Sequence, residues 1–304
     1  MIHCQRSGKI SQPIVFATLV RSAISQARAR LLIQSLRAFG GDLCDCPFWV
    51  FTTDPEKAPC AGFEALNAQV IPLEVPQTVA GYIFGDKVYA CAKAEAMAGA
   101  SIQSLVWFDP MCLVLNPPVA FNLCAECDAA VRPVHIRNVG LLTTDPLDHY
   151  WRTIYATFKV PDIHHSAETF VDQAHIRAYF NSHAFAVRPC ANLMGRWYPL
   201  FENLVLDQSF QSQSCQDDRH QIFLFQAVLS ALLVTSLEPE RLKILPPEYN
   251  YPYNLHQSVP LERRASSFND LVTLVYEERP VDPRMIDDII VNEPLRTWLI
   301  KHLP

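Results

Sequence analysis

The residue best placed to do chemistry is Asp109, inside a segment (residues 104–118) that reads S-L-V-W-F-D-P-M-C-L-V-L-N-P-P. The apolar run before the acid is typical of a strand buried on both faces, and Pro110 directly after it breaks the hydrogen-bond ladder. Open α/β sheets bind ligands at the carboxyl ends of their central strands. Asp109 is therefore a candidate catalytic residue, and the alternative is a simple turn residue after the strand.

The first hundred residues predict the elements that would position this acid. Short apolar runs with β-branched or aromatic residues indicate three strands, at residues 13–19, 47–51 and 69–73. Apolar residues at helical spacing or Ala-rich composition indicate two helices, one from a cap at Ser22 to Phe39 and one over residues 86–98, capped near Asp86. Strand and helix alternation of this kind predicts an α/β fold with a mainly parallel sheet.

The rest of the chain predicts more helices than strands. Extended segments are expected at residues 127–134, 185–187 and 271–276. Helices are expected at residues 148–158, 168–180, 192–206 and 220–235, and a last one begins at residues 292–294. Pro199 is expected to kink or break the third of these helices.

Composition excludes several classes of function. The chain has 304 residues, a net charge of −6 and no basic run, so nothing in it supports nucleic-acid binding. Only nine residues are glycine, and neither G-x-G-x-x-G nor G-x-x-x-x-G-K-[ST] occurs, so a nicotinamide oxidoreductase or a P-loop protein is not expected. A hydrolase with a G-x-S-x-G elbow is excluded in the same way.

Ten cysteines without a secretion signal favour reduced thiols and a cytoplasmic location. No uncharged apolar run is long enough for a transmembrane helix. Cys124 and Cys127 have metal-ligand spacing, but no second cysteine pair or close histidine pair follows them. A zinc site is therefore not expected.

Four segments, in order, resemble the nucleotide-sugar glycosyltransferases of the GT-A fold. Residues 104–118 are similar to the strand–D-x-D–strand–N-P signature, and residues 180–189 (F-N-S-H-A-F-A-V-R-P) to F-N-S-G-x-F-x-x-x-x-P. Residues 216–224 (Q-D-D-R-H-Q-I-F-L) and 244–250 (I-L-P-P-E-Y-N) are similar to the acid–Gln and L-P-x-x-Y-N segments of glycogenin- and galactosyltransferase-type families. The resemblance implies a mixed, mainly parallel GT-A sheet flanked by helices.

The same resemblance implies one GT-A-like domain over residues 1–304. Its nucleotide-binding half would span about residues 13–135 and its acceptor-side half about residues 136–256. Residues 257–304 would add a C-terminal strand and helix.

The resemblance also implies roles for individual residues. Residues at the ends of the first two strands would lie beside the nucleoside: Thr18, Val20, Arg21, Thr52 and Thr53. Lys87 could neutralise the diphosphate as a point charge, and a solvated lysine in the first turn of a helix is its alternative. Residues near the donor sugar or acceptor would be Asn181, Ser182, His220 and Gln221, where a turn before a strand is the alternative for the first two. Asp217 or Asp218 could act as the base of an inverting transfer, or both could be helix N-caps.

Two departures from the family pattern bear on metal binding. Met111 stands where the second acid of D-x-D is expected, and a thioether is a poor ligand for Mg²⁺ or Mn²⁺. A metal site on Asp109 and a distal ligand at His256 is therefore doubtful, and an isolated exposed histidine is the alternative at His256. His183 stands where glycine is usual, which would narrow the approach to the sugar.

These observations lead to two hypotheses on one fold. In the first, the protein transfers a sugar from a UDP- or GDP-sugar to an unknown acceptor. Asp109 would contact the ribose or donor sugar, and Lys87, Arg188 or a histidine would replace a metal ion. In the second, the chain is a binding or scaffold protein descended from such enzymes, which has lost catalysis.

Overall fold

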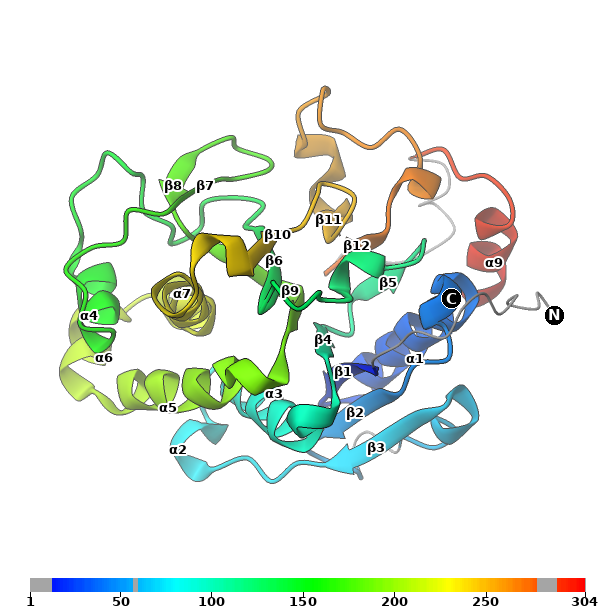
Figure 1. Ribbon diagram of the computed structural model, residues 1–304, viewed down its shortest axis with the longest axis horizontal. Coiled ribbons are helices and arrows are strands. Elements are labelled where there is room, and N and C mark those ends of the chain that lie inside the picture. Colours follow the sequence, from blue (N-terminus) through cyan, green and yellow to red (C-terminus); the bar gives the residue numbers. More distant parts are fainter. Residues whose placement is uncertain (1–12, 57–59, 278–288, 304) are drawn as a thin grey trace.

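The computed structural model describes residues 13–56, 60–277 and 289–303, and its centre is a seven-stranded sheet (Figure 1). The strands run in the order β10 (Leu242–Ile244), β6 (Ala129–Pro133), β9 (Phe180–Val187), β4 (Ser104–Phe108), β1 (Ile14–Val20), β2 (Phe48–Thr52) and β3 (Ala68–Pro72). Only β9 is antiparallel to its neighbours β4 and β6. The predicted mixed, mainly parallel α/β sheet is confirmed.

Two small sheets and a set of helices complete the described part of the chain. One sheet has the order β11 (Tyr251–Pro252), β12 (Thr273–Val275) and β5 (Cys112–Val114), and the other pairs β7 (Ser166–Glu168) with β8 (His175–Arg177). The helices are α1 (Ala23–Phe39), α2 (Gln77–Ala80), α3 (Gly85–Ala98), α4 (His149–Thr157), α5 (Leu193–Leu206), α6 (Gln208–Ser214), α7 (Asp218–Ser236) and α9 (Leu295–His302). Short 3₁₀ turns connect several of them.

Strands β1, β2 and β4 are mainly apolar because both faces of the sheet are covered. Successive side chains of a strand point to opposite faces. In β4, Leu105 and Trp107 pack in the cluster that contains α3, α5 and α7, whereas Val106 and Phe108 pack in the cluster that contains α1. The run before Asp109 is thus a strand buried on both faces, as its sequence predicts.

Helix α1 begins and ends where the sequence predicts. The Ser22 hydroxyl accepts a hydrogen bond from the Ser25 amide at 3.2 Å, and the Gly40 amide donates to the Leu36 carbonyl at 2.8 Å. Gly41 has a φ of +57°, a conformation that glycine adopts without strain. The helix packs on one face of the sheet. Its first turn lies at the same edge of the sheet as the carboxyl ends of β1 and β2.

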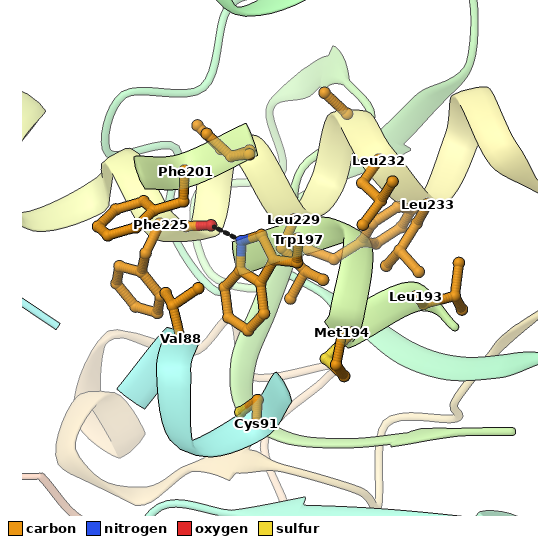
Figure 2. Close-up of a cluster of buried hydrophobic side chains, with 14 of the residues drawn as sticks. Val88, Cys91, Leu193, Met194, Trp197, Phe201, Phe225, Leu229, Leu232 and Leu233 are labelled. Atoms are coloured by element: carbon orange, nitrogen blue, oxygen red, sulfur yellow. Dashed lines mark hydrogen bonds between the residues drawn. The ribbon is translucent and has the colours of Figure 1, made fainter. Parts of the chain in front are cut away.

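Helices α3, α5 and α7 form the core on the other face, and Trp197 lies between them (Figure 2). The indole of Trp197 is fully buried and its Nε1–H donates to the Phe225 carbonyl at 2.9 Å. Val88 and Cys91 of α3 and Leu229 of α7 pack in the same cluster. This packing fixes α3 and α7, which carry two residues of the site described below, Lys87 and Gln226.

Strand register brings the ends of β1, β2 and β4 to one edge of the sheet. Val20 pairs with Thr52, and Ala17 pairs with Trp107, so Asp109 follows β4 at the level of the last residues of β1. On the other side, Phe108 pairs with Ala184 of β9. Residues from four strands therefore meet around Asp109.

Three local predictions are corrected by the structure. Residues 168–180 are not helical but contain the last residue of β7, the whole of β8 and the first residue of β9, because the amides of Phe170 and Val171 bond to the carbonyls of Val134 and His135. Helix α5 is not broken at Pro199 but continues through it. Helix α9 starts at Leu295 without a side-chain cap, although Glu293 accepts a hydrogen bond from the Thr297 amide at 3.1 Å.

Candidate active site

Asp109 is buried, with 7 % of its surface exposed, and both of its carboxylate oxygens have partners. Lys87 Nζ lies 2.8 Å and His183 Nδ1 2.9 Å from Oδ2, and Trp107 Nε1–H donates to Oδ1 at 3.0 Å. Burial alone would raise the pKa of Asp109, but the charge of Lys87 and the hydrogen bond from His183 outweigh it and hold the pKa well below its usual value. Asp109 is ionised at neutral pH.

Lys87 is the cation that compensates Asp109, and only 1 % of its surface is exposed. The alternative of a solvated lysine is therefore wrong. Its ammonium also donates to the Ser182 carbonyl at 2.9 Å, and it lies 5.0 Å from the ring centroid of Phe225. Lys87 occupies this place because α3 starts at Gly85, where a Cβ atom would lie 2.2 Å from the Val79 carbonyl oxygen. Asp86 lies in the first turn of α3 and is not its cap.

His183 links Asp109 to Glu277. Its Nδ1 faces Asp109, and its Nε2 lies 3.0 Å from Glu277 Oε1. Burial would lower the pKa of His183, but the bonds to the two carboxylates raise it to about 9, and the bond from His183 lowers the pKa of Glu277. The imidazole is therefore a cation at neutral pH. Asn254 Nδ2–H donates to Glu277 Oε2 at 2.7 Å and completes the chain of contacts.

A cavity of about 160 Å³ opens beside this network. It is lined by His183 and Glu277, by Asn181 of β9, by Gln226 of α7 and by His135 after β6, among others. His183 has 22 % of its side chain exposed, whereas the Lys87 side chain has 2 %. His183 is therefore the cation of the network that faces the cavity, and Lys87 stands behind it.

Asn181 and Ser182, which the resemblance predicts to lie near the donor sugar or acceptor, are both joined to this network. Asn181 Oδ1 accepts hydrogen bonds from the His183 amide at 2.8 Å and from Asn250 Nδ2 at 2.7 Å. The Ser182 hydroxyl donates to Gln226 Oε1 at 3.0 Å. They lie within β9, so the alternative of a turn before a strand is wrong.

The residues predicted to lie beside the nucleoside gather at the ends of β1 and β2, but they differ in exposure. Thr18, Val20 and Thr52 have 1 % of their surface exposed or less, so contact with a ligand requires the residues over them to move. Thr53 and Arg21 are half-buried. Arg21 Nη2–H donates to Asp86 Oδ1 at 2.8 Å, and the guanidinium lies 5.8 Å from the ring centroid of Phe84.

The start of α7 holds four predicted residues away from Asp109. Asp217 is the N-cap, with Oδ1 accepting from the His220 amide at 3.0 Å, and its Oδ2 lies 2.7 Å from His220 Nδ1. Asp218 is exposed, and Gln221 Nε2–H donates to the Cys215 carbonyl at 2.7 Å. Nine residues separate Asp217 from Gln226, which corresponds to about 13 Å along the helix axis. Their roles stay predictions.

Arg188 and His256 also lie apart from the network. Arg188 follows the carboxyl end of β9, beside the start of β4, where its Nε lies 3.5 Å from Asp128 Oδ1. His256 is 3 % exposed and not the exposed histidine of the alternative prediction, since its Nδ1 lies 2.7 Å from the Tyr251 hydroxyl. Neither side chain contacts Asp109.

The residues around Asp109 do not fit a site for Mg²⁺ or Mn²⁺, which the GT-A fold implies. Both carboxylate oxygens already bind protein donors, two of them cationic. Met111 packs against two apolar clusters and offers no oxygen ligand. Within residues 13–56, 60–277 and 289–303, no three His, Cys, Asp or Glu side chains group in a way that could hold a metal ion.

Sequence reasoning missed three members of the site. Trp107 was interpreted only as an apolar strand residue, and Glu277 gives no local signal because its partner His183 is 94 positions away. His135 is 5 % exposed, and neither ring nitrogen has a hydrogen-bond partner among the described residues. Burial lowers the pKa of His135 well below its usual value, so the ring is neutral. The sequence marks His183 only by its place at a usual glycine and does not single it out among the histidines that could replace a metal ion.

The fold is that of the GT-A glycosyltransferases. The galactosyltransferase LgtC, solved with donor and acceptor sugar analogues, superposes with a TM-score of 0.54 at 13 % identity over 95 % of this chain and 96 % of that one. The bifunctional glycosyltransferase WbbM superposes with a TM-score of 0.56 at 11 % identity over 98 % of this chain. This chain spans 53 % of the length of WbbM.

Residues 16–234 match the family of Rhodobacterales glycosyltransferase domains, and the chain belongs to that family. No curated protein matches the sequence. Across the described residues, no helix combines the length and the apolar composition needed to cross a membrane. The predicted GT-A superfamily is confirmed.

Proposed function

We propose that this protein transfers a sugar from a UDP- or GDP-sugar to an acceptor without a divalent metal ion, at a degenerate D-x-D motif. The observation that carries the proposal is the pair of cations on the motif acid: Lys87 at 2.8 Å and His183 at 2.9 Å from Asp109 Oδ2. In this proposal the two cations take the role that the resemblance assigns to a bound metal ion. The cytoplasmic location expected from the cysteines belongs to the same proposal.

Sugar transfer breaks the bond between the anomeric carbon and the diphosphate oxygen and forms one to an acceptor oxygen, which loses a proton. The leaving diphosphate gains negative charge, and fixed cations or donors in a site with little water stabilise it. His183 faces the cavity as a cation and would meet this charge once its Nε2–H turns from Glu277 to the leaving oxygen. Lys87 and Asp109 would hold the imidazolium in place, so Asp109, whose two oxygens already have partners, would act on the donor through His183.

Neighbouring residues would then contact the remaining parts of the donor. Arg21 and Thr53, at the half-buried ends of β1 and β2, would lie beside the base or ribose. Asn181 and Ser182 would position the sugar or acceptor from β9. Neither Asp217 nor Asp218 lines the 160 Å³ cavity. Either could take the proton of the acceptor only if the acceptor binds beside the start of α7. The assignment of a nucleotide half and an acceptor half is part of this proposal.

Calorimetric titration of the full chain with UDP- and GDP-sugars tests the proposal, once with EDTA and once with Mn²⁺. We expect one donor to bind and to be hydrolysed or transferred at the same rate in both buffers. His183→Gln should reduce that rate by about 10²–10³, the usual loss for one group that stabilises developing charge. Absence of binding by every donor would contradict the proposal, and a requirement for Mn²⁺ would contradict its metal-free form.

One observation favours the alternative of a binding or scaffold protein, namely that the ion pair on Asp109 is complete without a ligand. Met111→Asp, which restores the second motif acid, separates the two, with Met111→Asn as an uncharged control. Gain of Mn²⁺ binding or of donor hydrolysis in the aspartate variant alone would indicate a decayed enzyme. Turnover by the wild type with EDTA, unimproved by either variant, would indicate a metal-independent one.

A further inference from the structure

A second and larger cavity, of about 360 Å³, lies one strand away from Asn181. Arg132 of β6, whose Cα pairs with that of Asn181 across the sheet, lines it together with Phe170 and Arg263. Glu168 and Glu262 complete its charged lining. Nothing in the proposed sugar transfer uses these residues.

Arg132 is an unusual cation because it is 5 % exposed and binds no carboxylate among the described residues. Its Nη1–H donates to the Leu245 carbonyl at 3.4 Å, while Nε and Nη2 have no hydrogen-bond partner there. The guanidinium stacks on Phe170, with Cζ 4.9 Å from the ring centroid. A buried charge with most of its donors unsatisfied is unfavourable unless something else binds them.

The other charged groups of the cavity do not supply that partner. Glu168 forms an ion pair with Arg263, and Glu262 Oε1 accepts a hydrogen bond from Gln173 Nε2 at 3.1 Å. Arg263 also donates through Nη1 to the Thr169 carbonyl at 3.4 Å. Both lining acids already have partners. The unsatisfied Nε and Nη2 of Arg132 are therefore the feature of the cavity that indicates a ligand.

We propose that this cavity binds a ligand that carries an oxyanion, a carboxylate or a phosphate group, through the guanidinium of Arg132, which would turn its covered Nε and Nη2 towards the cavity. These two donors form the side of the guanidinium that matches two oxygens of one carboxylate or phosphate. The volume accommodates a group the size of one sugar residue. This proposal does not depend on sugar transfer by the Asp109 network. If that network does transfer a sugar, the anion lies one strand from Asn181, and the acceptor is acidic.

Thermal unfolding of the full chain in inorganic phosphate and in glucuronate, each matched in ionic strength with chloride, tests this site. At an anion concentration about tenfold above Kd, we expect the wild-type Tm to rise by about 2–4 °C. A rise with phosphate alone assigns a phosphorylated ligand, one with glucuronate alone a sugar acid, and one with both an oxyanion of either kind. No rise with either anion would overturn the proposal.

Arg132→Met distinguishes ligand binding from a structural role, and Arg241→Gln, which removes a partly exposed partner of Asp128, is the control. Without added anion, Arg132→Met should have the wild-type Tm or a higher one, since it removes an unpaired buried charge, and it should lose the anion-dependent rise. Arg241→Gln should keep the rise. A lower Tm in Arg132→Met with the rise retained would show that Arg132 is only a structural cation.

Arg132→Lys keeps the test decisive should the methionine variant fail to fold. Lysine retains the charge but presents a single point donor in place of the planar side of the guanidinium. We expect the half-saturating anion concentration to increase by about tenfold or more. An unchanged half-saturating concentration would overturn the assignment to Arg132.

Discussion

Two aspartate–histidine pairs within the described part of the chain have nearly equal lengths but very different surroundings. Asp109 and His183 lie 2.9 Å apart at the ends of the central strands, and Asp217 and His220 lie 2.7 Å apart at the start of α7. The Asp109 side chain is 10 % exposed and that of Asp217 is 60 % exposed. Both aspartates are candidates for catalysis from sequence alone, so the comparison isolates what burial adds.

Burial turns the first pair into part of a network and leaves the second as a local contact. Around Asp109, neighbouring charges and hydrogen bonds outweigh the effect of burial. They raise the pKa of His183 to about 9 and lower that of Asp109. At α7, the pKa of Asp217 is lowered chiefly by the hydrogen bond from the His220 amide, which is the bond of an N-cap. Exposed ion pairs contribute about 0–1 kcal/mol, whereas breaking a buried one costs about 3–5 kcal/mol.

Asp109→Asn should therefore have the largest effect of any single change in either pair. It leaves the ammonium of Lys87 and the imidazolium of His183 without a carboxylate between them. We expect the free energy of unfolding to fall by about 3–5 kcal/mol, measured by urea denaturation.

A double variant, Lys87→Met with Asp109→Leu, serves as the control for that loss. It removes both charges together, so we expect it to be less destabilised than Asp109→Asn alone. A loss below about 1 kcal/mol in Asp109→Asn would mean that the pair behaves like an exposed one and that the contrast between the two regions is wrong.

The first of these regions was largely predictable from the sequence because its elements are signalled locally. The apolar run before Asp109, the cap at Ser22 and the strand and helix alternation all depend on neighbouring residues, and the structure has them where expected. The partners of Asp109 give no local signal of this kind. Lys87 meets Asp109 from 22 positions away and His183 from 74 positions away, and no periodicity predicts such contacts.

The second half was harder because its strands are short and paired with distant segments. Residues 168–180 have apolar side chains at spacings that suit a helix, yet the backbone of Phe170 and Val171 bonds to β6's continuation at Val134 and His135. Tertiary hydrogen bonds of this kind outweigh weak local preferences. The lack of a hydrogen-bond partner for Nε and Nη2 of Arg132 among the described residues is likewise a property of the packed structure and has no signal in the sequence.

The titration of His183 makes the free energy of unfolding depend on pH. The folded-state pKa of His183, about 9, lies above the ordinary value of about 6.5, so its contribution to stability is complete below about pH 6.5 and is lost as the pH rises through 9. We expect the wild-type free energy of unfolding to fall by roughly 3 kcal/mol over that window through this group alone. His183→Gln should flatten the profile. Equal slopes in the wild type and this variant would contradict the assignment.

Asp217 gives the smallest effect and the clearest separation of cap from catalyst. As an N-cap, Asp217→Ala should lower the free energy of unfolding by about 1 kcal/mol, while Asp217→Asn should change it by only a few tenths, because asparagine caps as well as aspartate does. Asparagine cannot accept a proton as a base. Donor turnover in Asp217→Asn therefore decides the matter: a rate equal to the wild type leaves Asp217 as a helix cap, and a loss of 10²-fold or more at unchanged stability would make it the general base and move the reaction towards α7.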